Sequence, residues 1–249
     1  MKNIITSGCS YSTNTGEIPY SSIIQSNLNV SVENKAWPGQ SNKSIIKGIR
    51  DSIKSGSNNT TFICQLTHLH RLNLYCTLNE KYIDFQPMFI NPIPEIKDGN
   101  IQFDIDIDNP HKGTLRGVGV YGASTPSDNN LPNDMYGKLW DFYQTYLKYF
   151  YDDTESFNSL MDDVDDLNRL VKSTNNKIIY LYWSHIIPNK KELQKRNFVN
   201  FNGEYSMLNW STKNNLLDEI GTSHLSQDGH IKLAKKISNI LNIKKNKII

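Results

Sequence analysis

The stretch KNIITSGCSYS, at residues 2–12, indicates the fold class more clearly than any other part of the chain. Residues 2–7 form a short apolar run that stops at Gly8, which is typical of a buried strand. A serine that follows such a strand next to a glycine can lie on a tight turn, where its backbone N–H can donate to an oxyanion. Ser10 is therefore a candidate nucleophile, although the same residues also suit a turn that only joins a strand to a helix.

Strands and helices are predicted to alternate along the rest of the chain. Short apolar runs predict strands, and apolar residues at helical spacing predict helices, the last of which follows a candidate N-cap. This alternation predicts an α/β fold, a three-layer α/β/α sandwich with a flavodoxin-like, mostly parallel sheet of about five strands. Further strands are predicted at 29–36, 60–66 and 178–183, and helices at 45–53, 135–150, 157–171 and after Ser226.

Residues 72–131 interrupt this pattern. Within them, the segments 82–89, 101–107 and 118–121 have the alternation of half-exposed strands and are separated by Pro, Asn and Gly residues. We expect a β-rich insertion that enters directly after the third strand. The length of 249 residues fits one domain over 1–249 that contains this insertion.

The composition argues against several classes of function. A net charge of +2, from 27 basic and 25 acidic residues, predicts no nucleic-acid partner. Three cysteines without a C-x-x-C spacing indicate neither a disulfide framework nor a zinc site, and favour a reducing compartment. The sequence shows no signal peptide and no apolar segment of about 18 residues. We therefore expect a cytoplasmic protein without a membrane partner.

Polar residues also follow the other predicted strands. His224 lies on a loop before the last predicted helix, and histidine is the usual general base because its pKa lies near neutral pH. Gly39 follows the second strand and Thr67 the third, where each can donate a hydrogen bond to an oxyanion. Ligands bind beyond the carboxyl ends of parallel strands, so we expect these residues to meet Ser10 at one site.

These blocks resemble the SGNH/GDSL hydrolase family. Its blocks are G-D-S-x-S, a glycine after the second strand, G-x-N-D after the third, and D-x-x-H-P near the C-terminus. The first block here is also similar to a branch, frequent in phage and bacterial genomes, that begins G-C-S-[FY]-[ST]. The matching residues are Gly8, Ser10, Ser12, Gly39, His224 and Gly229, while Cys9 replaces an Asp and Leu225 replaces a Pro.

The resemblance implies a serine esterase that removes small acyl groups, most often acetyl, from carbohydrates or similar alcohols. Ser10 would be the nucleophile and His224 the base, with the oxyanion held by Ser10, Gly39 and Thr67. The resemblance implies no metal and no organic cofactor. Two alternatives stay open: an SGNH-like binding or structural protein, for example of a phage particle, and an acyltransferase that uses the same serine.

Two positions depart from the family pattern. The Asn of the third block falls at Thr67, which leaves Gln65 and Asn42 as candidate substrate-binding amides. The family's acid, three residues before the histidine, falls at Gly221, so the protein needs a substitute or works as a Ser-His dyad. The candidate acids are Asp218, Glu219 and Asp228.

Four further features have a functional and a simpler interpretation. Arg71 follows the third strand and can bind a substrate carboxylate or phosphate, or form a surface ion pair. His68 and His70 are at most half of a metal site, because no carboxylate or thiolate stands at a suggestive spacing. The aspartates within 162–166 suit a solvated helix face better than a cation site. Cys9 is expected to be a small buried residue, although a thiolate would be the stronger nucleophile.

Overall fold

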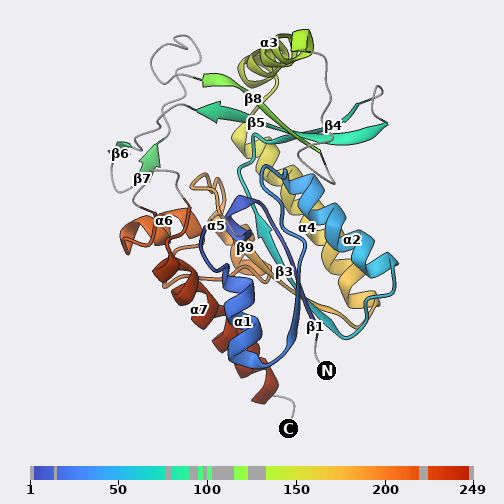
Figure 1. Ribbon diagram of the computed structural model, residues 1–249, viewed down its shortest axis with the longest axis vertical. Coiled ribbons are helices and arrows are strands. Elements are labelled where there is room, and N and C mark those ends of the chain that lie inside the picture. Colours follow the sequence, from blue (N-terminus) through green and yellow to red (C-terminus); the bar gives the residue numbers. More distant parts are fainter. Residues whose placement is uncertain are drawn as a thin grey trace.

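A four-stranded parallel sheet forms the centre of the protein (Figure 1). The computed structural model describes residues 3–13, 16–76, 80–89, 95–97, 100–102, 115–122, 133–218 and 224–246. When the four core strands are numbered along the chain, they lie side by side in the order 2-1-3-4, which is the flavodoxin-like order. The strands are β1 (Asn3–Ser7), β2 (Ser31–Asn34), β3 (Thr60–Leu66) and β9 (Lys177–Tyr182), in the order β2-β1-β3-β9.

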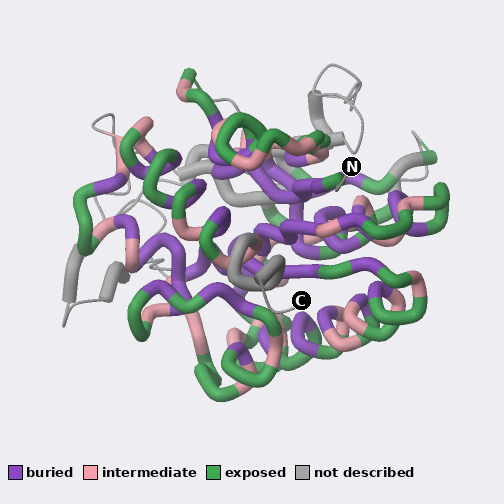
Figure 2. Tube along the Cα trace, turned by 90° about the horizontal axis from the view of Figure 1, so that it is seen from below, coloured by how far each residue is buried: buried purple, intermediate pink, exposed green. Residues whose placement is uncertain are grey.

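Helices cover both faces of this sheet, which confirms the predicted three-layer α/β/α architecture (Figure 1). Successive strand residues point to opposite faces, so Ile5 packs with the helices of one layer and Ile4 with those of the other. Figure 2 shows the buried strands between helices whose outer sides are exposed. One layer holds α2 (Asn42–Lys54) and α4 (Asp153–Ser173), and the other holds α1 (Tyr20–Leu28), α6 (Met207–Lys213) and α7 (Gln227–Asn246).

The element boundaries follow local capping chemistry. The Ser41 hydroxyl accepts from Ser44 N at the start of α2, and the predicted cap Ser226 accepts from Gly229 N at 3.2 Å at the start of α7. The helices α1, α6 and α5 (Lys190–Lys195) were not predicted, because each is short and lacks a long apolar repeat.

The sheet has four strands and not the predicted five or so. At the β9 edge the chain returns beside the sheet but forms only isolated parallel bridges, Tyr180 with Phe198 and Tyr182 with Ser206. A turn at 201–204 interrupts this segment, since Phe201 and Glu204 bridge to each other. The fifth position in the sheet is therefore only partly formed.

The predicted β-rich insertion is confirmed. It lies at the end of the molecule opposite the N-terminus, where β3 ends, and is followed by α3 (Asn133–Tyr149) (Figure 1). The second half of the strand predicted at 101–107 lies outside the described residues. The antiparallel strands are β4 (Leu72–Cys76), β5 (Lys81–Phe89) and β8 (Leu115–Gly122), with a separate pair β6 (Glu95–Lys97) and β7 (Asn100–Gln102).

A buried carboxylate fastens the insertion to the core. Asp84 of β5 is 1% exposed, and its Oδ1 accepts from the hydroxyls of Ser41 and Ser44 at 2.6 and 2.8 Å. The Nδ2 of Asn73 on β4 donates to the same oxygen at 3.0 Å. Burial raises the pKa of Asp84, and these hydrogen bonds oppose the shift. The N-terminus of α2, directly after the Gly39 turn, is thus held in place by the insertion.

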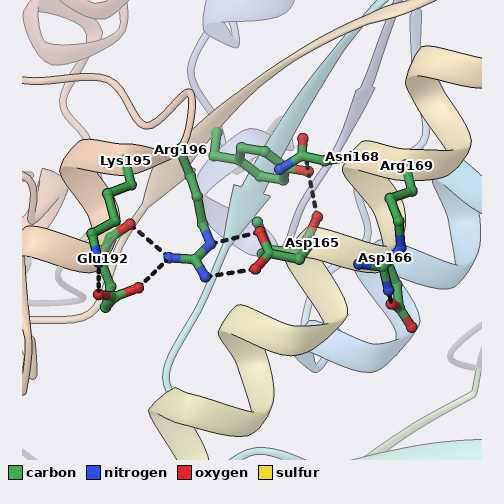
Figure 3. A network of polar contacts seen from close by, with 9 residues as sticks. Asp165, Asp166, Asn168, Arg169, Glu192, Lys195 and Arg196 are labelled. Carbon is green, nitrogen blue, oxygen red and sulfur yellow. Dashed lines mark hydrogen bonds and ion pairs between the residues drawn. The ribbon is translucent and has the colours of Figure 1, made fainter.

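The acidic face of α4 forms ion pairs. Figure 3 shows Arg196 between Asp165 of α4 and Glu192 of α5. Its Nε and Nη2 donate to the two oxygens of Asp165 at 2.8 and 2.7 Å, and Asp166 pairs with Arg169 in the same view. These acids are therefore neutralised by arginines.

Among the described helices, none has the length and apolarity needed to cross a membrane.

Candidate active site

Ser10 begins a short 3-10 helix, η1 (Ser10–Ser12), that starts three residues after β1 ends. Ser12 N donates to Cys9 O at 2.9 Å and closes the turn, while Ser10 itself stays partly exposed. Cys9 is 0% exposed, as expected for a small buried residue. The turn therefore presents Ser10 and buries its neighbour.

Gln65 of β3 holds this turn in place. Its Oε1 accepts from Cys9 N at 3.3 Å and from the Ser12 hydroxyl at 2.9 Å. A side chain at Gly8 has no room, because a Cβ there would come within 2.7 Å of Ser12 Oγ and 2.8 Å of Gln65 Oε1. The glycine of the first block is thus required by the close approach of Gln65 to the turn.

The Gly39 turn lies against the same segment. Trp37 N donates to Gly8 O at 3.0 Å, and Gly39 has φ +82°, a conformation that favours glycine. Within the described residues, the backbone N–H groups of Ser10 and Gly39 donate to no protein acceptor. Both are therefore available to hold an oxyanion.

Asn42 positions the chain that follows β3. Its Oδ1 accepts from Thr67 N at 2.7 Å, and its Nδ2 donates to the carbonyls of Thr67 and His68 at 3.3 and 3.4 Å. The Thr67 hydroxyl is buried and accepts from the Cys9 thiol at 3.5 Å. The amides of Asn42 and Gln65, predicted as substrate contacts, are both used here to hold the site together.

His224 reaches this site through an aromatic contact that was not predicted. The Tyr11 ring stacks on Trp183 with a centroid distance of 3.7 Å, and the His224 ring centroid lies 5.0 Å from that of Tyr11. Trp183 directly follows β9, and its backbone N–H donates to Leu66 O at 2.9 Å. The aromatic position that follows the serine in the block G-C-S-[FY]-[ST] could have pointed to Tyr11 as a site residue.

Burial shifts the pKa of both rings in this contact. It raises the pKa of Tyr11 to about 12 and lowers the pKa of His224. The Asp218 carboxylate opposes the shift at His224, and the Arg71 charge adds to it. His224 is therefore neutral near pH 7, which is the form that accepts a proton.

One of the three candidate acids lies beside His224. Asp218 N donates to His224 O at 2.9 Å, and the neighbouring residues Leu217 and Leu225 form an antiparallel bridge. Asp228 instead pairs with Lys232 at 2.8 Å, and its side chain is 62% exposed. Glu219, like Gly221, lies outside the described residues. Of the two described candidates, Asp218 is therefore the one that lies next to His224.

The other histidines are buried (His68 and His230) or half-buried (His70 and His185), and they are neutral near pH 7. The rings of His68 and His70 stack at 5.3 Å, and His185 lies 6.4 Å from His68. Burial lowers the pKa of all three, to about 3 for His70. In the described part of the chain, no three His, Cys, Asp or Glu side chains are arranged to hold a metal ion. His230 accepts from Tyr20 N through Nδ1 at 3.3 Å and so links α7 to α1.

Two solved structures have a similar chain path. The first, protein YXIM from Bacillus subtilis, has 12% sequence identity and a TM-score of 0.48; the match covers 99% of this chain but only 57% of that one. The second, from Desulfitobacterium hafniense DCB-2, is assigned to the G-D-S-L family of lipolytic proteins; it has 8% identity and a TM-score of 0.43, with 96% of this chain and 98% of that one covered. No protein-family model and no curated protein matches the sequence. Function is therefore inferred from the geometry of the site.

Proposed function

We propose that this protein is a serine esterase of the SGNH/GDSL type that hydrolyses small acyl esters. The contact between His224 and Tyr11 carries the proposal, because it brings a C-terminal histidine to the residue next to Ser10. The hydrogen bonds of Gln65 and of Trp37 N bring the third and second blocks to the same turn. Acetyl is the acyl group to test first, and a carbohydrate is the alcohol that the sequence resemblance favours.

The proposed reaction proceeds through an acyl-enzyme. Neutral His224 takes the proton of the Ser10 hydroxyl while Ser10 Oγ attacks the acyl carbon of the ester. The backbone N–H groups of Ser10 and Gly39 hold the oxyanion. The Thr67 hydroxyl, predicted as a third donor, is fully buried against Cys9 and supports the turn instead. His224 then gives the proton to the leaving alcohol, and water repeats the sequence to release the acid.

Asp218 is proposed to orient the imidazole and to stabilise its charged form. Its backbone bond to His224 and its effect on the pKa of that ring support this role. An acid placed six residues before the histidine, and not three, would account for Gly221 at the family's usual position. The protein would then be a triad enzyme with a displaced acid and not a dyad.

A covalent probe tests the proposal. A fluorophosphonate should add once to the wild type and once to the control variant Ser26→Ala. Ser26 is a suitable control because its hydroxyl donates to Ser22 O on the exposed surface of α1. Ser10→Ala should give no adduct, and His224→Ala should react at least about 100-fold more slowly. Intact mass spectrometry measures the adducts. Folded wild-type protein without an adduct would refute the proposal and favour a binding or structural protein.

The acyltransferase alternative uses the same acyl-enzyme and therefore the same probe result. It differs only in whether water or an alcohol accepts the acyl group. A sugar is added at increasing concentration as the acceptor alcohol, and chromatography of the products distinguishes the two. We expect free acid as the main product; an acyl sugar in excess over the acid would establish transfer.

A further inference from the structure

Arg71 lies at the edge of the proposed site. Its Nη1 donates to Gln40 O at 3.0 Å, so the guanidinium contacts the turn that carries Gly39. Arg71 directly follows His70, whose ring stacks on His68, and the His68 ring centroid lies 6.5 Å from that of Tyr11. The positive charge of Arg71 lowers the pKa of both Tyr11 and His224. The guanidinium therefore lies beside the Gly39 turn, in the neighbourhood of the Tyr11 ring.

Among the described residues, no carboxylate forms an ion pair with the guanidinium of Arg71. Arg50, Arg169 and Arg196 pair with Asp163, Asp166 and Asp165, respectively. Within the described residues, by contrast, Arg71 forms no ion pair, and its buried Nε has no hydrogen-bond acceptor. A buried donor without an acceptor costs free energy that a bound ligand can recover.

The groups around Arg71 on the site's side are neutral near pH 7. Burial lowers the pKa of His68 and His70, and it raises the pKa of Tyr11. The one carboxylate described close to these rings is Asp218, whose charge acts on His224. Within the described part of the chain, the site therefore has a positive charge that is not paired with a carboxylate.

On its other side, Arg71 lines a cavity of about 340 Å³ beneath β4. Asp152, Glu155 and Asp163 also line this cavity. Asp152 caps α4 by accepting from Glu155 N at 2.9 Å, and Asp163 pairs with Arg50 at 3.6 Å. Lys43 lines the cavity as well, but three carboxylates face it, so we expect an anion to bind Arg71 on the side of the Gly39 turn, where Nη1 contacts Gln40 O.

We propose that the ester recognised by this site carries an anionic group, a carboxylate or a phosphate, that binds Arg71 beside the scissile bond. An arginine side chain with unused N–H groups presents a planar fork that matches either anion. The claim that such an ester is hydrolysed rests on the proposed esterase function. Binding of the anion at Arg71 can be tested without hydrolysis.

The test compares ligands that differ only in charge. Binding of 4-acetamidobenzoate and of its neutral methyl ester, neither of which has a cleavable acetyl ester, is measured by calorimetry. Hydrolysis of 4-acetoxybenzoate and of its methyl ester is followed in parallel. 4-Acetamidophenyl phosphate replaces the carboxylate by a phosphate, and the tighter of the two anions identifies the substrate class. The proteins are the wild type, Arg71→Met, Arg71→Lys and the control Arg169→Met, which removes an exposed arginine paired with Asp166 on α4, away from the site.

The wild type and Arg169→Met should prefer the anion over its methyl ester by about 10-fold or more, in binding and in kcat/KM. Arg71→Met should reduce this ratio to about 2-fold or less, and Arg71→Lys should keep an intermediate value. A wild type without the preference, or an Arg71→Met variant that keeps it, would overturn the proposal. Binding that depends on Arg71 without any hydrolysis would refute the esterase function alone, whereas hydrolysis without a charge preference would refute the anion site alone.

Discussion

Replacing Gln65 with Leu should loosen the turn that presents Ser10. The substitution leaves the buried Cys9 N–H without its acceptor, and the Ser12 hydroxyl keeps one of its two bonds, that to the Tyr20 hydroxyl at 3.0 Å. An unpaired buried N–H costs about 1–3 kcal/mol, and the lost hydroxyl bond about 1 kcal/mol. We therefore expect the free energy of unfolding to fall by about 2–4 kcal/mol, and Tm by roughly 5–12 °C for a chain of this size. Labelling of Ser10 by a fluorophosphonate should slow as well.

Gln25→Leu is the matched control. Gln25 Oε1 also accepts from a backbone N–H at 3.3 Å, that of Val32, but this bond is exposed to solvent. Its loss should cost less than about 0.5 kcal/mol. Urea unfolding followed by tryptophan fluorescence measures both variants. If Gln65→Leu is as stable as Gln25→Leu and is labelled at the wild-type rate, the bonds of Gln65 do not hold the turn.

Three further predictions concern titratable side chains. Asp84→Ala removes the two hydrogen bonds that fasten the insertion to α2 and a third one within the insertion, so urea unfolding should show a loss of about 3 kcal/mol. Burial lowers the pKa of His224 and the Asp218 carboxylate opposes this, so the acid limb of the pH profile of kcat/KM should have its midpoint below 6.5, and Asp218→Asn should move it lower still. Burial lowers the pKa of His230 to about 4 from 6.5, so the stability that its neutral form contributes is complete above pH 6.5 and is lost as the pH falls. At pH 5 the loss is about 2 kcal/mol, and chemical denaturation of His230→Asn should lack it.

Each of these predictions has an outcome that contradicts it. Asp51→Ala, which removes an exposed carboxylate paired with Lys47 on the same helix, should change stability little, and an equal effect at Asp84 would show that the insertion is fastened elsewhere. An Asp218→Asn profile that is unchanged or moved to higher pH would exclude the carboxylate as a neighbour of the imidazole. A His230→Asn variant with the wild-type pH dependence would assign that dependence to other groups.

Much of the fold was predictable because it follows from local patterns. The continuous apolar run at 60–66 predicted β3 with its observed bounds, since a strand buried on both faces needs no polar alternation. The helical repeats predicted α2 and α4, and Ser226 predicted the start of α7. Short helices such as α6 follow from contacts with the core and not from their own sequence, so they were not predicted.

The sequence by itself determined the chemical groups of the site and their order along the chain. It placed Ser10, Gly39, Thr67 and His224 next to predicted strand ends or a helix start, and parallel strands bring such ends together. Only the tertiary structure decided the contacts among them. It placed Tyr11 between Trp183 and His224, placed Asp218 and not Asp228 next to His224, and left Arg71 without a carboxylate partner among the described residues. These outcomes depend on burial and on distances between residues far apart in the chain, which no local pattern encodes.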